Sequence, residues 1–440
     1  MFNLLYVDNF RGFKNAYIPI KDVNFLVGEN STGKTSILAL ISLLGSLDFW
    51  FDQEFNTDVF RLGRFKDIVS IQAENRRQFR IGYIFVNKDN GVKQYDDFEA
   101  VLMTFTEKDN NPLISQYNYL NSQGQVKIIF SRGDIYYKYT KDTEVSKNSE
   151  YVLKIFEDWA AEELSDNKEF RTLRKVSYYE RRRSLAFIDD LLREIFSEQA
   201  IIKDKQRFTV KYPMFDMNIA WLAPIRSKPK RTYDEYKLEF NPEGEHTPYL
   251  IRHLLRKRKA SNDFLKFIEK FGNESGLFES IDIKGYGREV ASPFELTIVM
   301  NNIYLAVVNV GYGVSQALPV IVEMFARTKG TQFLIQQPEI HLHPKAQAAL
   351  GDVVYKLATE DNKRFFIETH SDYIIDRFRL NYRMNQGKTK IRSQILFFGR
   401  NLEGNYVVPI DILENGEYTE EQPKAFREFF IHEEMRILGI

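Results

Sequence analysis

Cysteine is absent from the 440-residue chain, and this absence excludes several kinds of chemistry. There can be no disulfide bonds, no thiol nucleophile, no iron–sulfur cluster and no cysteine-bound zinc. An excess of charge is missing too, because 61 Lys and Arg residues balance 61 Asp and Glu residues. A uniformly basic coat for nucleic acid is therefore excluded, although a local basic patch is not.

Long hydrophobic runs and targeting signals are also lacking. The most apolar long stretch, residues 294–310, is interrupted by Glu295 and three asparagines and is too short to span a bilayer. Residues 1–9 do not have the charged start and apolar core of a signal peptide. We therefore expect a cytoplasmic protein with no membrane contact. Its hydrophobic content of 43% is that of an ordinary globular chain.

The order of local patterns predicts an α/β protein. Strands are expected at 2–7 and 23–27, followed by a buried apolar helix at 36–47. Short buried strands are again expected at 333–335 and 365–368, with a helix beginning near Pro344 between them.

Two insertions are expected within this α/β head. Alternating runs separated by turn residues indicate an antiparallel β subdomain at 76–140. Residues 145–210 are charged and helix-forming and predict a helical insertion. Residues 1–75 and 215–440 are then expected to form the head itself.

A complete phosphate-binding motif follows the second predicted strand. Residues 28–35 fit G-x-x-x-x-G-K-[ST] at every fixed position, between a strand and a helix. Glycines let the backbone wrap around a phosphate, and the helix amino terminus favours negative charge. Lys34 is expected to reach the β- and γ-phosphates of ATP, and Thr35 to ligate Mg²⁺. The expected nucleotide-binding residues here are Gly28, Asn30, Ser31, Thr32, Gly33, Lys34, Thr35 and Ser36.

A second glycine-containing segment precedes a helix pattern at 315–326. Residues 311–316 read Gly-Tyr-Gly-Val-Ser-Gln, follow a hairpin expected at 294–309, and place Ser315 at the expected N-cap. A helix start of this kind can bind an anion. Taken alone, however, a simple glycine turn explains these residues better.

The later motifs stand in an informative order. Residues 333–344 read Phe-Leu-Ile-Gln-Gln-Pro-Glu-Ile-His-Leu-His-Pro, and residues 366–371 read Phe-Ile-Glu-Thr-His-Ser. After a phosphate motif and a glycine loop, this order resembles the ABC-type ATPase heads of the RecF, SMC and OLD lineage. Those heads carry a P-loop, signature loop, Walker B strand, D-loop and switch histidine in that sequence. The chain is most similar to the stand-alone AAA/ABC-type ATPases of bacterial anti-phage and DNA-processing operons.

The resemblance implies an α/β P-loop fold of the ABC-type head and a role for each motif. The signature loop, which binds the γ-phosphate held by a second protomer, would comprise Gly311, Gly313, Ser315 and Gln316. Arg11 lies where such heads often contact the nucleotide. Residues 341–343 would be the D-loop, with His343 near the nucleotide, and His370 would sense the γ-phosphate.

Glutamine at both Walker B positions departs from the pattern of the family. Gln336 stands where an acid usually helps to hold Mg²⁺, and Gln337 stands where the catalytic glutamate belongs. An amide can neither carry the charge nor take a proton from water. Glu339 is the nearest remaining carboxylate in this motif, so Glu339 and His370 are the expected substitutes in catalysis. The glutamine at 336 is either natural or a Glu→Gln exchange that traps ATP.

Two further features each have two explanations. His341 and His343 could be metal ligands rather than part of a D-loop. A basic cluster in the helical insertion could contact DNA or RNA phosphates, or it could be a solvated charged face. The cluster comprises Arg171, Arg174, Lys175, Arg181, Arg182 and Arg183, and residues 256–259 form a second basic run.

The sequence therefore predicts an ATPase head that dimerises head-to-tail on ATP and regulates a partner effector, such as a nuclease, in phage defence or DNA processing. Impaired hydrolysis is expected. Three alternatives remain: an ABC transporter's nucleotide subunit, a RecF-like DNA-repair clamp, and a non-hydrolysing ATP-sensing scaffold. The long insertion argues against the transporter. No carboxylate-rich Toprim-like segment follows the head, so another chain would have to cleave nucleic acid.

Overall fold

The computed structural model describes most of the chain, in two compact units. The described residues are 3–57, 59–86, 98–131, 134–141, 149–162, 170–175, 184–198, 218–235, 237–256, 258–287, 289, 291–385 and 390–429. The first unit comprises residues 1–20, 29–217 and 398–408, and the second comprises residues 21–28, 218–397 and 409–440. The chain passes from one unit to the other within the phosphate motif and again within a late hairpin.

An eight-stranded antiparallel sheet, in the order β2-β1-β4-β5-β6-β7-β8-β9, forms the first unit. Its strands are β1 (Asn3–Asp8), β2 (Ala16–Ile20), β4 (Gln78–Val86), β5 (Phe98–Lys108), β6 (Asn111–Asn121), β7 (Gly124–Ser131), β8 (Asp134–Thr140) and β9 (Arg171–Lys175). Asp109 and Asn110 join β5 to β6 in left-handed conformations, with φ of 52° and 66°. Such two-residue turns match the twist of the flanking strands. The antiparallel sheet expected from the alternating runs is thus present, and β1 and β2 extend it.

The described helices of the first unit are α1 (Lys34–Leu44), α2 (Leu47–Asp52), α3 (Phe65–Ile68), α4 (Ser149–Ala161) and α5 (Leu185–Glu198). The helix expected at 36–47 ends earlier, because Gly45 closes α1 and Ser46 accepts a hydrogen bond from Asp48 N to start α2. Residues 171–175 form strand β9, paired with β8, although the sequence indicated helix there.

A six-stranded sheet, in the order β10-β14-β15-β3-β16-β17, runs through the second unit. Its strands are β3 (Val23–Gly28), β10 (Ile219–Leu222), β14 (Gln332–Gln336), β15 (Arg364–Glu368), β16 (Ser393–Asn401) and β17 (Gly404–Ile412). The pairs β10–β14, β14–β15 and β15–β3 are parallel. A separate antiparallel sheet contains β11 (Ser280–Gly285), β12 (Phe294–Met300) and β13 (Ile303–Ala306). Asn301 and Asn302, with φ of 51° and 58°, make the predicted turn of the β12–β13 hairpin.

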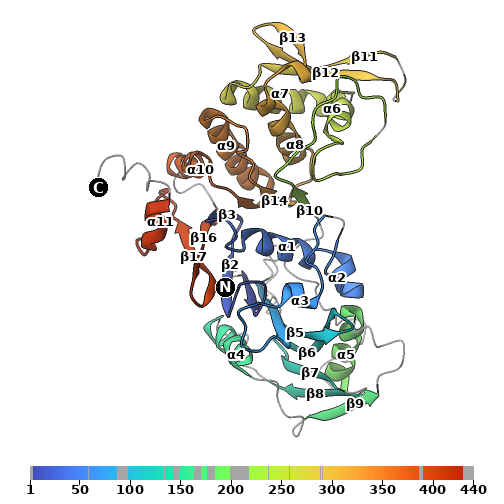
Figure 1. Cartoon of the computed structure of the whole chain (residues 1–440), viewed down its shortest axis with the longest axis vertical. Helices are drawn as coiled ribbons and strands as arrows, with labels where there is room; N and C mark the ends of the chain where they lie inside the picture. The colour runs from blue at the N-terminus through green and yellow to red at the C-terminus, as the bar shows by residue number, and fades with distance from the viewer. Residues whose placement is uncertain are drawn as a thin grey trace. The chain divides into compact units, whose positions relative to one another are not determined.

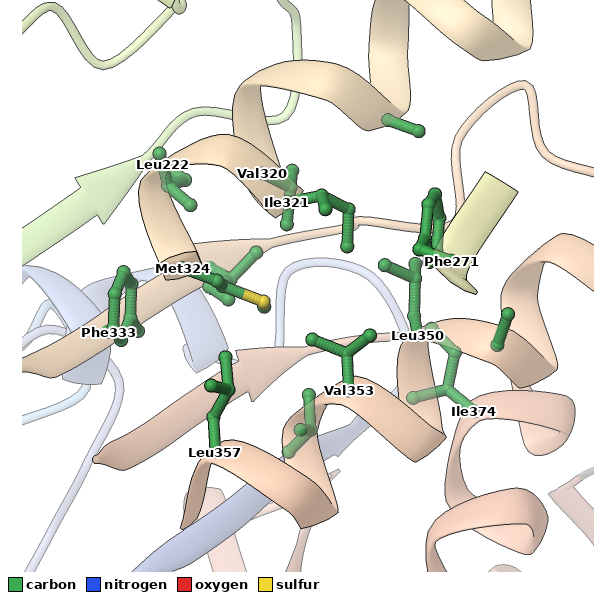
Figure 2. Close-up of a cluster of buried hydrophobic side chains, with 14 of the residues drawn as sticks. Leu222, Phe271, Val320, Ile321, Met324, Phe333, Leu350, Val353, Leu357 and Ile374 are labelled. Atoms are coloured by element: carbon green, nitrogen blue, oxygen red, sulfur yellow. The ribbon is translucent and has the colours of Figure 1, made fainter. Parts of the chain in front are cut away.

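Helices of the second unit cover the parallel strands with an apolar core. They are α6 (Thr247–Arg256), α7 (Arg258–Ser275), α8 (Tyr312–Ala326), α9 (Pro344–Asp361), α10 (Asp372–Met384) and α11 (Lys424–Phe429), with a 3₁₀ turn at Val307–Asn309. Figure 2 shows Met324 of α8, Phe333 of β14 and Val353 of α9 turned toward one another. α9 begins at Pro344 as predicted, and it packs beside α10 (Figure 1). Within the described residues, no helix combines the length and the apolar character needed to cross a membrane.

A buried charged network attaches the loop before α6 to α8. His246 Nε2 lies 2.5 Å from Glu323 Oε1, and Arg327 Nε donates to Glu323 Oε2 at 2.8 Å. His246 and Glu323 are each 2% exposed. Burial raises the pKa of Glu323, but hydrogen bonds from His246 and Arg327 outweigh it and leave the pKa below its usual range. The Glu323 carboxylate is therefore ionised at neutral pH, and its buried charge is stabilised by both His246 and Arg327.

Replacing His246 should loosen α8. In His246→Ala, Glu323 loses one of its two partners while staying buried, which typically costs about 3 kcal/mol. Amide hydrogen exchange in peptides covering 240–256 and 312–326 should then be about 100-fold faster, since 1.4 kcal/mol corresponds to a factor of ten. His253→Ala, on the half-buried side of α6, is the control and should change exchange little. Equal protection in both variants would contradict a structural role for the network.

Candidate functional site

The phosphate motif forms the loop between β3 and α1. β3 ends at Gly28, and α1 begins at Lys34. Ser31 and Gly33 adopt positive φ of 63° and 96° within the loop. Glycine is required at position 33, because an added Cβ would lie 2.5 Å from the Phe13 ring. The strand, tight loop and helix start expected from the sequence are therefore present.

Side chains of the motif hold this loop from within. Lys34 Nζ donates to the main-chain oxygen of Glu29 at 2.7 Å, and Thr32 Oγ1 donates to the same oxygen at 2.8 Å. Lys34 and Thr32 are buried. The exposed residues of the loop and first helical turn are Glu29, Asn30, Ser31 and Thr35, and Ser36 is half-buried. Exposed residues of the loop therefore lie on both sides of an anchored lysine, an arrangement that suits phosphate binding.

Two residues of the β16–β17 hairpin brace the loop, and no sequence motif indicated them. The Arg400 guanidinium donates to Ser31 O, and Arg400 Nε donates to Asn405 Oδ1 at 3.0 Å. Asn405 also lies against the loop, since a Cβ added at Gly33 would be 3.1 Å from Asn405 Nδ2. Arg400 and Ser31 are 369 positions apart, so only the folded structure reveals this contact.

Arg11 lies in the first unit and is engaged with main-chain carbonyls. Its backbone has a φ of 56°, and its Nη2 donates to Leu62 O at 2.7 Å. Burial lowers the pKa of Arg11, an effect that Asp67 partly opposes. Contact between Arg11 and a nucleotide stays a prediction.

The predicted Walker B residues, Gln336 and Gln337, lie at one edge of the parallel sheet in the second unit. Because β14, β15 and β3 are parallel neighbours, their carboxyl ends share this edge. The register pairs Gln336 with Glu368, and Glu368 with Leu26. β3 ends two residues later, at Gly28, where the phosphate motif starts. Ligands of parallel α/β sheets bind outside the carboxyl ends of the strands.

Glu368 supplies a carboxylate at this edge that the sequence analysis missed. Gln336 Nε2 donates to Glu368 Oε2 at 3.2 Å, and Gln337 N donates to Glu368 O at 2.7 Å. Glu368 is 7% exposed. It follows Gln336 by 32 positions, and only strand pairing places the two together. Its position at the end of a predicted strand was the available signal.

Glu339, the carboxylate expected to replace a catalytic acid, accepts hydrogen bonds from residues 369 and 370, and its catalytic role stays a prediction. Its Oε1 accepts from His370 N at 2.7 Å, and its Oε2 accepts from Thr369 Oγ1 at 2.9 Å. Burial raises the pKa of Glu339, although these hydrogen bonds oppose the shift. Arg226 donates to Gln336 O at 3.3 Å, and burial lowers the pKa of Arg226 to about 10.

The histidines of the later motifs contact neighbouring residues, and their roles at a nucleotide stay predictions. His343 is the N-cap of α9, and its Nδ1 accepts from Ala346 N at 3.3 Å. The His341 ring meets the Tyr312 ring edge-on, and the His370 ring stacks on Phe429. Across the described residues, no group of three His, Asp or Glu side chains is arranged to hold a metal ion.

The glycine segment at 311–316 differs from the sequence prediction in where its helix starts. α8 begins at Tyr312 with Gly311 as its N-cap, because Val314 N already bonds to Gly311 O at 3.1 Å. The prediction that Ser315 is the N-cap was therefore wrong. Ser315 Oγ donates to Tyr312 O at 2.8 Å inside the first turn. Gln316 is buried, and a Cβ added at Gly313 would lie 3.0 Å from His341 O.

The basic cluster is described only in part. Arg171, Arg174 and Lys175 belong to β9, and Arg171 is exposed. Residues 181–183 lie outside the described part of the chain. Contact of the cluster with nucleic acid therefore stays a prediction.

Comparisons with known proteins agree with the motifs. A family model described as the AAA ATPase domain (AAA_15) matches residues 1–375. The curated protein sequences gave no match.

Solved structures similar to the chain include heads of SMC proteins. An SMC head bound to the C-terminal winged-helix domain of ScpA is 12% identical, with 93% of this chain and 98% of that chain covered and a TM-score of 0.45. A Pyrococcus furiosus Smc head with an extended coiled coil, bound to the C-terminal domain of ScpA, is 13% identical, with 99% of each chain covered and a TM-score of 0.40. The SMC head domain from Thermotoga maritima is 12% identical, with 93% of this chain and 98% of that chain covered and a TM-score of 0.39. Sequence identities and TM-scores this low say nothing about the function of this chain.

The family match rests on most of the chain and includes the phosphate motif, the signature segment and the Walker B strand. This chain belongs to the AAA ATPase domain family.

Proposed function

We propose that this protein binds ATP with Mg²⁺ and is a slow ATPase. The observation that carries the proposal is the phosphate loop between β3 and α1, in which Lys34 is anchored to Glu29 O and the residues at 29–31 and 35 are exposed. Lys34 would exchange its bond to Glu29 O for one to the terminal phosphates, and Thr35, which is exposed, would contribute its hydroxyl to the metal shell. When bound, Mg²⁺ would neutralise charge developing on the phosphates.

The carboxylate at the catalytic edge would come from β15 rather than from β14. Glu368 lies beside Gln336, which occupies the usual position of the acid. Together they offer one negative charge and one amide, which can orient water by hydrogen bonds. We assign the positioning of metal-bound solvent to Glu368, while Gln337 provides no base. Slow ATP turnover follows because glutamines stand at both positions where the family usually has an acid.

The head is proposed to dimerise head-to-tail on ATP and to control a partner effector, as the resemblance of its motifs implies. Support for a contact surface comes from the segment leading into α8. There, Ile303, Tyr304 and Tyr312 expose 58%, 67% and 43% of their surface. Exposed apolar residues next to a signature segment suit a partner protomer that closes over ATP. Regulation of a nuclease in phage defence or DNA processing is the biological role that fits such a head.

Loss of the Lys34 charge should abolish tight ATP binding. Isothermal calorimetry at fixed Mg²⁺ should show affinity for Lys34→Ala reduced at least about 100-fold, because a buried cation facing the phosphates is lost. Lys66→Ala, on α3 of the same unit, is the matched control and should bind as the parent does. ATP binding by Lys34→Ala with parental affinity would refute the assignment.

Association on ATP should depend on the start of α8. No atom lies within 4 Å of a Cβ added at Gly311, so Gly311→Arg can fold while projecting a bulky cation into the proposed interface. Light scattering should show ATP-dependent growth in mass for the parent and none for the variant. Asn415→Arg, in the turn after β17, is the control and should behave as the parent. An oligomeric state that ignores both ATP and the substitution would contradict the proposal.

Steady-state phosphate release should report the roles of Gln336 and Glu368. Gln336→Glu should hydrolyse ATP at least about tenfold faster by restoring the usual acid. Glu368→Gln should lower turnover and raise the Mg²⁺ concentration that ATP binding requires, whereas Glu360→Gln on α9 should do neither. The double variant, Gln336→Glu with Glu368→Gln, should recover activity because one carboxylate remains. Brisk hydrolysis by the parent, or no effect of either substitution, would place the catalytic group elsewhere.

A further inference from the structure

A cavity of about 280 Å³ lies in the second unit beside the first turns of α8. Its inner wall is apolar and buried, and consists of Tyr233, Tyr249, Leu296, Val307, Leu318 and Pro319. Its volume is at the lower end for small-molecule sites, so a compact molecule fits and a peptide segment does not.

Two polar groups in the wall lack their ordinary partners. Thr247, which is 3% exposed, has a buried Oγ1 with no hydrogen-bond partner among the described residues. Residue 319 is proline, so Ser315 O cannot accept the usual helical bond from residue 319. Thr247, Ser315 and Pro319 all line the cavity. Buried polar groups are normally satisfied, so this wall is suited to a ligand that brings hydrogen-bonding atoms.

Positive charge gathers at the mouth of the cavity. Lys228, Lys230 and Lys237 line it and are exposed. Lys237 pairs with Glu235 at 2.6 Å, whereas Lys228 and Lys230 have no ion pair within the part of the chain that the structure describes. Glu245 is the acidic residue of the lining. Because Glu235 neutralises Lys237, two cations, Lys228 and Lys230, stand against one lining carboxylate and favour an anionic ligand.

The shape of the wall depends on a glycine and on the buried network. Gly244 has a φ of 81°, and a Cβ there would be 2.5 Å from Pro319 Cβ and 3.2 Å from Thr247 Oγ1. His246, two residues further on, bonds to Glu323 of α8. The loop is therefore held close to α8, so that the cavity is built from well-fixed parts.

We propose that this cavity binds a small organic anion: a flat apolar body against Tyr233 and Tyr249, and a phosphate, sulfonate or carboxylate group near Lys228 and Lys230. The cavity shares no residue with the phosphate loop, although Ser315 also belongs to the predicted signature loop, and the anion site does not rest on the proposed nucleotide function. Because Ser315 and Pro319 belong to α8, ligand binding is coupled to any rearrangement of that helix.

A fluorescent aromatic sulfonate, anilinonaphthalene sulfonate, is a suitable probe, and its neutral analogue phenylnaphthylamine lacks only the anion. The parent should bind the sulfonate more tightly than the neutral analogue at low salt. Replacing Lys228 and Lys230 together by Ala should weaken sulfonate binding about tenfold and leave the neutral analogue unchanged. Ala at Lys266 and Lys270 of α7 is the matched control and should alter neither.

A substitution that fills the cavity tests the location of the anion site independently of the lysine variants. Ser227 is a half-buried residue of the lining, and Ser227→Trp should block both probes while circular dichroism and thermal unfolding stay close to those of the parent. Lys34→Ala should bind both probes as the parent does. Equal binding of the sulfonate by the parent, the double lysine variant and Ser227→Trp would overturn the proposed site. Loss of binding in Lys34→Ala would also overturn it, since the probe would then occupy the phosphate loop.

Coupling to α8 is measured by repeating the titration with saturating ATP. The affinity for the sulfonate should change about fivefold or more, and by reciprocity the probe should change the affinity for ATP by the same factor. Unchanged affinity with ATP bound would overturn the coupling. If calorimetry shows no ATP binding at all, the proposed nucleotide function fails, while the anion site is still judged by the lysine and tryptophan variants.

Discussion

The parallel pairing of β14, β15 and β3 is the constraint on which the candidate catalytic edge depends. Pairing fixes the register so that Gln336, Glu368 and Leu26 are successive neighbours across the strands. Shifting one strand by a single residue would reverse the direction of its side chains and separate Gln336 from Glu368. The apolar core under α8, α9 and α10 keeps that register, because the alternate residues of each strand are buried in it.

An amide beside a carboxylate has different chemistry from two carboxylates. In the pair of Gln336 and Glu368, the amide hydrogen satisfies one carboxylate oxygen without a metal ion. Two carboxylates at this distance would repel each other until a cation or a proton came between them. The pair of Gln336 and Glu368 is therefore stable in its own right, which is compatible with the slow ATPase that we propose.

Much of the fold could be predicted from the sequence because its signals are local. The phosphate loop, the β12–β13 turn at Asn301 and Asn302, and the start of α9 at Pro344 all depend on neighbouring residues. Local signals gave the wrong start for α8. The two glycines predicted a loop up to Ser315, but backbone hydrogen bonds start the helix at Tyr312. The contacts of Glu368 with Gln336 and of Arg400 with Ser31 could not be found from local signals, because pairing between distant segments makes them. The cavity beside α8 could not be predicted from local signals either, because it forms only when the loop at 244–247 folds onto that helix.

The bond between Arg400 and Ser31 has a consequence for how the protein is made. The phosphate loop is synthesised early, but the hairpin that braces it is 369 residues further along the chain. At synthesis rates of 5–20 residues per second, roughly 20–70 s separate the two on the ribosome. During that interval the loop has no brace, so a nascent or truncated chain would hold nucleotide poorly. A chain that stops before Arg400 would therefore lack this hydrogen bond to Ser31 O, and its phosphate loop would be less well fixed.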